Sequence, residues 1–185
     1  MKHEIEFYED KHQYVVDGIC LPSITQLLTK IFPNKYKDVP DWMLQSAAEK
    51  GTMVHKAIQD YCEKGIESDL PELYNFKFLK KRYGFDVINN ERPVVLEIAG
   101  IPVAAGTYDM EIGMNGQIGG CDIKRTAKLD FTYLKYQLNL YREAVKQTYG
   151  REWQFLRALH LRDDVRKFIE IPIDEKVIQE IGELI

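Results

Sequence analysis

An Asn-Gly pair at residues 115 and 116 constrains the fold of this chain more than any other short feature. It separates two strand-like segments, and a two-residue type I′ turn needs positive φ at both central residues, which Asn and Gly tolerate. With these two residues as the loop, position 114 pairs with 117 and position 112 with 119. The same register places Asp109 directly opposite Asp122 on one face of an antiparallel pair.

Two opposed carboxylates destabilise a sheet, because directly opposite Cβ atoms lie only ~4.5–5.5 Å apart. A divalent cation removes this repulsion, and Mg²⁺ and Mn²⁺ prefer hard oxygen ligands of this kind. Lys124 follows Asp122 by two residues and therefore points to the same face of the strand. The sequence predicts a metal site formed by Asp109, Asp122 and the carbonyl of Ile123, with Lys124 beside it.

Such a site suits the hydrolysis of a phosphodiester. A bound cation would polarise the phosphodiester and lower the pKa of a water molecule. Lys124 would orient that water, accept its proton or stabilise charge on the phosphate oxygens. Gly119 and Gly120 weaken a strand, so we expect them to permit close approach of backbone or substrate.

The rest of the chain shows a regular order of helical and strand patterns. We expect a hairpin or short strands in residues 5–21, three helices in residues 23–32, 41–65 and 71–84, and three strands in residues 86–100, 101–114 and 117–126. A long helix up to Gly150, a strand pair joined near residues 163–164 and a last helix from residue 174 follow. This order predicts a mixed α/β fold, a central sheet with an antiparallel meander flanked by helices.

The composition fits one compact globular domain. The 185 residues are 45% hydrophobic and 29% charged, enough to bury roughly 70% of the unfolded surface. We expect a single domain over residues 1–185, with a helical part at about 22–84 and the catalytic sheet and helices at about 86–185. The net charge of −4 argues against a broadly basic surface but leaves room for a local basic groove.

Cysteines and hydropathy indicate the compartment. Cys20, Cys62 and Cys121 are too widely spaced for a zinc-binding pair and too few for a disulfide framework, so we expect free thiols. The sequence has no run of about 18 apolar residues and no secretory signal pattern, so we expect a cytoplasmic protein without a membrane span.

Five segments together resemble the PD-(D/E)XK nuclease superfamily, and within it the RecB-like exonucleases with their phage-type and CRISPR-adaptation relatives. GTYD (106–109) is similar to the family's glycine-x-x-aspartate, DIK (122–124) to its acid-x-lysine and QLNLY (137–141) to its glutamine-tyrosine helix motif. GTMVHKAIQDY (51–61) resembles an upstream G-T-x-x-H segment, and LPSITQLL (21–28) an N-terminal segment of phage members. Each motif alone is weak, but the five occur in the family's order.

The resemblance implies a restriction-endonuclease-like core and a DNA nuclease that needs Mg²⁺ or Mn²⁺. The implied activity is that of a RecB-like exonuclease in phage or bacterial DNA recombination, repair or processing. His55, Asp109 and Asp122 are the implied metal ligands, Lys124 is the implied catalytic residue, and Gln137 and Tyr141 are expected to support the site or contact DNA.

The implied partner is DNA, as linear ends or single strands, with a helicase or recombination protein acting in trans as a further option and no membrane. Several relatives carry four cysteines for an iron–sulfur cluster. This chain has three at other spacings, so no cluster is expected.

Two alternative functions stay open. One is a structure- or end-specific endonuclease of the same fold, and the other is a nucleic-acid-binding subunit with a vestigial metal site. The complete set of two acids and a lysine counts against the second. The sequence contains neither G-x-S-x-G nor H-E-x-x-H, which argues against a serine hydrolase and against a zinc protease.

Several single residues also admit simpler interpretations. His55 alone would be read as a half-buried helix histidine bonded to a carbonyl, and Gly51 as a packing glycine between helices. Glu91 and Glu97 both precede the GTYD segment, and the sequence leaves open which of them reaches a metal. Arg125 has no firm role, with phosphate contact as one option.

Overall fold

The computed structural model describes residues 2–8, 11, 13–33 and 39–184. Its elements follow the predicted order. They are β1 (Ile5–Tyr8), β2 (Gln13–Val16), β3 (Ile19–Leu21), α1 (Ile24–Ile31), α2 (Asp41–Lys64), α3 (Pro71–Tyr83), β4 (Asp86–Ile98), β5 (Ile101–Met114), β6 (Gln117–Lys124), α4 (Phe131–Tyr149), β7 (Phe155–Arg162), β8 (Val165–Ile171) and α5 (Lys176–Gly182). The sequence NKYKDVP (34–40) predicts a loop before α2, and its residues 34–38 lie outside the described residues, as does residue 185.

Two sheets organise the molecule. The larger sheet has the strand order β4-β5-β6-β7-β8, and a smaller antiparallel sheet has the order β1-β2-β3. Only the β6–β7 pair is parallel in the larger sheet, and α4 makes the connection between these two strands. The predicted mixed α/β fold with an antiparallel meander and flanking helices is therefore confirmed.

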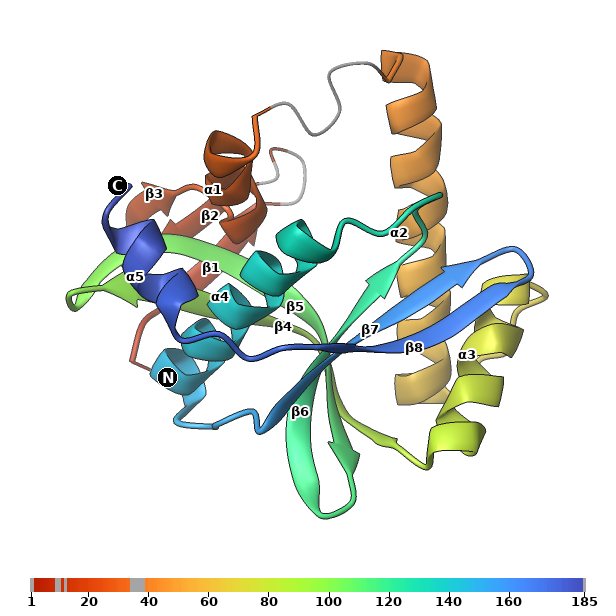
Figure 1. Ribbon diagram of the computed structural model, residues 1–185. Helices are drawn as coiled ribbons and strands as arrows, with labels where there is room; N and C mark the ends of the chain where they lie inside the picture. The colour runs from red at the N-terminus through yellow and green to blue at the C-terminus, as the bar shows by residue number, and fades with distance from the viewer. Residues whose placement is uncertain (1, 9–10, 12, 34–38, 185) are drawn as a thin grey trace.

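Helices cover both faces of the larger sheet. On one face Leu156 and Ala158 of β7 pack with residues of α1, α4 and α5. On the other face Leu159 and Leu161 pack with residues of α2 and α3. This alternation along β7 is the two-residue period of a strand buried on both sides. Figure 1 shows α4 across the front of the sheet and α2 passing behind β7 and β8.

The helix ends follow local sequence signals. Ser23 caps α1 in a capping box with Gln26, in which each side chain bonds the other residue's backbone N–H. Gly65, Gly84 and Gly150 end α2, α3 and α4 in the left-handed conformation, as their positions predict.

The helical spacing of apolar residues in 41–65 predicts a buried stripe along α2, but burial is confined to the second half of the helix. Val54 and Ile58 are buried, whereas Leu44 is half-buried and Ala47 is exposed. The first half of this 24-residue helix extends beyond the sheet, with Trp42 71% exposed. Figure 1 shows this part of α2 standing clear of the sheet at the top of the view. None of the helices in the described ranges has the length and apolar character needed to cross a membrane.

The predicted Asn-Gly turn is present. Asn115 and Gly116 have φ of 53° and 77°, the positive values that a type I′ turn requires. The β5–β6 register pairs Met114 with Gln117 and Met110 with Cys121, as the turn predicts.

Candidate functional site

Acidic residues form a row across three adjacent strands. The β5–β6 ladder ends at the pair Met110 and Cys121, and the next position on each strand is Asp109 and Asp122. Asp109 Oδ2 accepts a hydrogen bond from the backbone N–H of Ile123 at 2.6 Å. The carboxylate of Asp109 therefore reaches across to β6.

Glu91 on β4 extends this row. The β4–β5 register pairs Asn90 with Met110 and Arg92 with Tyr108, so Glu91 lies across from Asp109. Glu91 has a φ of 45° within a strand, which costs a non-glycine residue about 1–2 kcal/mol. Backbone strain of this kind clusters at functional sites.

His55 joins helix α2 to the row of acids. Its Nδ1 atom lies 3.5 Å from Glu91 Oε1 and 3.5 Å from Asp109 Oδ1. Its Nε2 atom lies 3.2 Å from the carbonyl oxygen of Ile123. One ligand atom from each of His55, Glu91 and Asp109 lies within 4.8 Å of the others, so the three side chains could share one cation.

The electrostatics at His55 favour a positive charge. Burial opposes protonation of the imidazole, but the carboxylates of Asp109 and Glu91 outweigh it and raise the pKa of His55 to about 9. A protonated imidazole donates from both nitrogens, which matches contacts to a carbonyl on one side and to carboxylates on the other. A metal ion bound there would replace the proton on Nδ1.

Asp122 and Lys124 form an ion pair beside this group. Lys124 Nζ lies 2.6 Å from Asp122 Oδ2, and Asp122 is 3% exposed. Burial raises the pKa of Asp122 to about 6, with Lys124 opposing the shift and Asp109 adding to it. Burial alone would lower the pKa of Lys124, but Asp122 and Asp109 raise it. The lysine is thus a half-buried cation held by its acidic neighbours.

The donor groups suit a hard divalent cation. The group offers one imidazole nitrogen, from His55, and the carboxylate oxygens of Glu91 and Asp109. Mn²⁺ accepts both kinds of ligand, and Mg²⁺ prefers the oxygens. This set differs from the predicted one, because Glu91 belongs to it and Asp122 is turned to Lys124. The carbonyl of Ile123 is next to the group through its contact with His55.

Gln137 and Tyr141 lie on α4, and both are buried. A Cβ atom on Gly106 would lie 2.9 Å from Tyr141 Oη, so the glycine of GTYD makes room for the tyrosine of QLNLY. Burial raises the pKa of Tyr141, and the charges of Asp109 and Asp122 raise it further. Among the described residues Gln137 Oε1 has no hydrogen-bond partner. These contacts place the α4 face beside the acids but assign it no catalytic role.

The glycine pair before Asp122 serves packing. A Cβ atom on Gly120 would lie 2.2 Å from Trp153 Cζ3, and one on Gly119 would lie 2.4 Å from the side chain of Phe155. The expected close approach of backbone is confirmed at Gly119, where the carbonyl oxygen of Phe155 is as near as its ring, and the rings of Phe155 and Trp153 fill the rest of the space.

Arg125 and Glu97, to which the sequence assigns no definite role, both have structural partners. Arg125 Nε donates to Glu72 Oε1 at 2.7 Å, and its guanidinium also pairs with Asp163 at 3.0 Å. Glu97 accepts from Lys2 at 2.6 Å and contacts His3 at 2.5 Å. Glu91 is thus the acid that reaches the candidate metal site, and Arg125 links β6 to α3 and to the β7–β8 turn.

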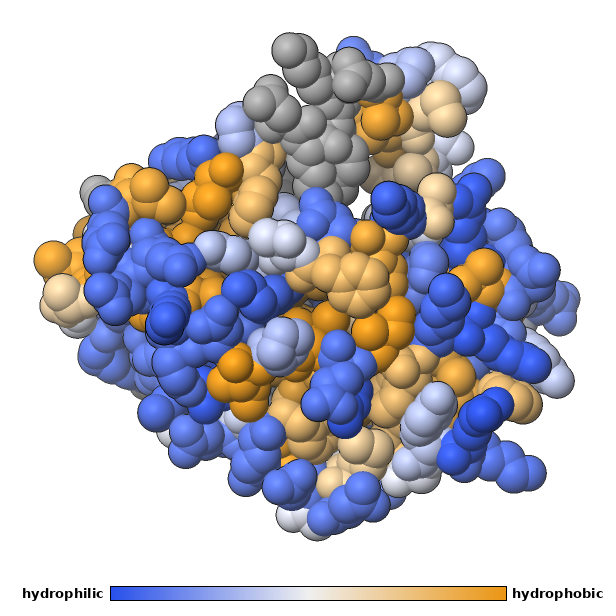
Figure 2. All heavy atoms as spheres, viewed as in Figure 1, coloured by the Kyte–Doolittle hydropathy of each residue, from blue (hydrophilic) through white to orange (hydrophobic). Residues whose placement is uncertain are grey.

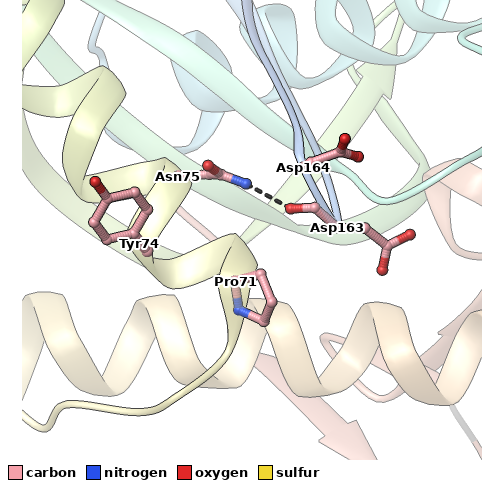
Figure 3. Close-up of a pocket in the computed structure, with 5 residues that line it drawn as sticks. All are labelled: Pro71, Tyr74, Asn75, Asp163 and Asp164. Atoms are coloured by element: carbon pink, nitrogen blue, oxygen red, sulfur yellow. Dashed lines mark hydrogen bonds between the residues drawn. The ribbon is translucent and has the colours of Figure 1, made fainter.

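Two surface depressions lie away from the candidate site. One is lined by Pro71, Tyr74, Asn75, Asp163 and Asp164. Figure 3 shows that Asn75 donates across it to the carbonyl oxygen of Asp163, at 2.7 Å. This contact fastens α3 to the β7–β8 turn, and none of the lining residues belongs to the candidate site.

Comparisons with known proteins show distant structural similarity only. No protein-family model matches the sequence, and the comparison with curated proteins finds no match. Among solved structures the chain is similar to the crystal structure of SSO0001, with 17% identity and a TM-score of 0.47 over 87% of this chain and 72% of that one.

Proposed function

We propose that this chain is a DNA nuclease dependent on Mg²⁺ or Mn²⁺, with a restriction-endonuclease-like core and the activity of a RecB-like exonuclease. The observation that carries the proposal is the convergence of His55, Glu91 and Asp109 within 4.8 Å, beside the Asp122–Lys124 ion pair. His55, Asp109, Asp122 and Lys124 are residues that the resemblance implies, and Glu91 joins them on the neighbouring strand.

The topology around these residues supports the proposed core. Three antiparallel strands, β4 to β6, are followed by helix α4 and by β7, which returns parallel to β6. The acids come from the meander, and the helix that follows carries Gln137 and Tyr141.

The residues around the site have separable tasks. His55, Glu91 and Asp109 would hold the cation, and Asp122 would complete the set on release from Lys124. A bound divalent cation would neutralise charge on the phosphate and supply a nucleophilic water at neutral pH.

Lys124 would act on the phosphate and the attacking water. Its ammonium group lies 2.6 Å from the buried carboxylate of Asp122 and its side chain is 21% exposed, so solvent screens its charge only in part. It would donate hydrogen bonds to a phosphate oxygen as negative charge builds there. Before that release the ion pair with Asp122 holds this ammonium group in place, and the Nε2 atom of His55 contacts the carbonyl of Ile123 on the same strand.

A vestigial binding subunit is disfavoured by one detail. Glu91 keeps a strained backbone conformation at the position that faces His55. Sequence drift in a site without function would remove the cost of about 1–2 kcal/mol by substitution with glycine. An endonuclease of the same fold would use the same residues, so the substrate form separates it from an exonuclease.

Degradation of DNA by purified protein tests the proposal. With Mn²⁺, wild type should degrade linear DNA, and Asp109→Asn and Lys124→Ala should lose this activity while their circular dichroism spectra remain native. Covalently closed circular DNA should resist an exonuclease and be cut by an endonuclease. Retained activity in both variants, or no cleavage of any DNA by wild type, would overturn the proposal.

A further inference from the structure

A groove on α3 has the chemistry of a site for unpaired nucleotides. It has a volume of about 730 Å³, and its lining includes Tyr61, Tyr74, Lys77, Phe78 and Lys81. On α3 the last four lie at positions i, i+3, i+4 and i+7 and therefore share one helix face. Figure 2 shows mostly hydrophilic atoms on the right-hand side of the molecule, over α3 and the adjacent ends of β7 and β8.

The positive charge of this groove contrasts with the acidic chain. Lys77, Lys80 and Lys81 line it together with a single acid, Asp86, whereas the whole chain carries a net charge of −4. Lys80 pairs with Asp86 at 3.0 Å, and Lys77 pairs with Glu67 at 2.7 Å. Both acids are highly exposed, and exposed pairs are weak, so phosphates can replace them.

Lys81 and Tyr74 are available for a ligand. Lys81 is exposed and has no ion-pair partner among the residues that the structure describes. Tyr74 is 66% exposed, and Figure 3 shows its ring directed away from Asp163 and Asp164. Of the other three rings of the groove, Tyr61 lies under Lys77 and Phe78 under Arg166, while Phe85 is 1% exposed and stacked on Phe168. Tyr74 is therefore the ring on which a planar group can stack.

We propose that this groove binds single-stranded DNA, with a base stacked on Tyr74 and phosphates on Lys77 and Lys81. Aromatic rings stack on any base, but the faces of bases in a duplex are already covered by their neighbours. The inference rests on the proposed nuclease function in one respect, since it assigns the DNA strand a path towards that site. Tyr61 follows His55 by six residues on α2, a rise of about 9 Å along the helix.

Fluorescence anisotropy with a short labelled oligodeoxythymidylate tests the groove in EDTA, which removes divalent cations and prevents cleavage. Tyr74→Ala should weaken binding on the order of tenfold, as expected for one lost base stack. Lys81→Ala should weaken binding and reduce the slope of log affinity against log salt by about 0.7. Both residues are exposed, so the fold should not change.

Matched controls separate the groove from general effects. Tyr74→Phe keeps the ring and should bind as wild type does. Lys176→Ala removes a charge from α5, at the other end of the molecule in Figure 1, and should leave the salt slope unchanged. Wild-type affinity in both Tyr74→Ala and Lys81→Ala, or tighter binding of wild type to a duplex of the same length, would overturn the inference.

The outcomes for the groove and for the nuclease function are distinguishable. Should wild type fail to cleave any DNA while the groove variants lose binding, the groove stands and the nuclease proposal fails. Should wild type cleave DNA while the groove variants bind and cleave normally, only the groove fails.

Discussion

The Nε2 atom of His55 lies 3.2 Å from the carbonyl oxygen of Ile123, so helix α2 is joined to the strand that carries Asp122 and Lys124. The other nitrogen of the same ring faces Glu91 on β4 and Asp109 on β5. One imidazole thus connects a helix to three strands. Substitutions at these positions should separate metal binding, chemistry and stability.

Glu91→Gln should weaken Mn²⁺ binding, because it removes a carboxylate from the His55, Glu91 and Asp109 group. Substitution of a residue that only supports a metal ligand typically lowers metal affinity roughly tenfold or more, so the loss of a ligand should lower it at least as much. Isothermal titration calorimetry measures it. Glu97→Gln is the control, since Glu97 is bonded to Lys2 and His3. Equal Mn²⁺ affinities for both variants would show that Glu91 is not a ligand.

Lys124→Met should slow DNA cleavage by about 10²–10⁴-fold, because it removes the ammonium group proposed to act on phosphate and water. Mn²⁺ affinity should not fall, since a protonated lysine is not a metal ligand and its removal releases Asp122. Single-turnover cleavage with saturating Mn²⁺ tests this, with Lys176→Met as the control for the loss of an exposed charge. A rate within a few fold of wild type would remove Lys124 from the chemistry.

Gly120→Ala should destabilise the fold by roughly 1–3 kcal/mol, because its Cβ would lie 2.2 Å from the fully buried Trp153. Gly51→Ala should stabilise it by about 0.5–1 kcal/mol, since Gly51 is inside α2 and no atom of the described residues lies within 4 Å of the added carbon. The packing interpretation of Gly51 is therefore wrong. Urea denaturation measures both values, and a gain in stability at Gly120 would contradict the packing argument.

Arg125→Met should reduce the free energy of unfolding by about 3 kcal/mol, because it leaves the carboxylate of Glu72 buried without its guanidinium partner. The double variant Arg125→Met with Glu72→Gln should recover part of this loss, as urea denaturation would show. If Arg125→Met lost DNA binding at unchanged stability, the residue would instead be a phosphate contact.

Stability should fall in acid partly through Glu72. Burial alone would raise the pKa of Glu72, but the N–H of Asp163 and the guanidinium of Arg125 outweigh it and hold the pKa below 4.5. A carboxyl group with a lowered folded pKa stabilises the protein above its unfolded value of 4.5, and this contribution is lost as the pH falls through the folded pKa. Glu72→Gln should therefore show a shallower loss of unfolding free energy below pH 4.5 than wild type. Parallel slopes would contradict this assignment.

The sequence predicts the β5–β6 half of the candidate site because its register depends on a single turn. Asn115 and Gly116 allow one tight connection, and no bulge interrupts the ladder between this turn and the pair Met110 and Cys121. Side-chain alternation then places Asp122 and Lys124 together, as their ion pair bears out.

The β4–β5 half could not be predicted in this way. These strands meet at Ala99 and Gly100, but Leu96 pairs with Ala104 and Glu97 with Pro102, so Val103 is an extra residue on β5. A register counted from the turn would place Asn90 opposite Asp109. The bulge moves Glu91 there instead. The sequence carries no signal for this bulge or for the positive φ of Glu91.

The roles of Gly119, Gly120 and Arg125 could not be predicted from the sequence, because their partners lie far away along the chain. The glycine pair at 119 and 120 is matched to Trp153 and Phe155, which lie more than thirty positions later in the chain. Arg125 reaches Glu72 and Asp163, on either side of it in sequence. Local patterns predict elements and their ends, whereas such contacts depend on how the elements pack.

The row of acids also determines when this site can exist. Glu91, Asp109 and Asp122 belong to three strands and His55 to a helix packed against them, so no loop can assemble the group by itself. A cation that binds there selects the folded chain, and at a concentration 100 times its Kd it would add about 2.7 kcal/mol to the unfolding free energy. Cation binding and folding of the three-stranded meander are therefore thermodynamically linked.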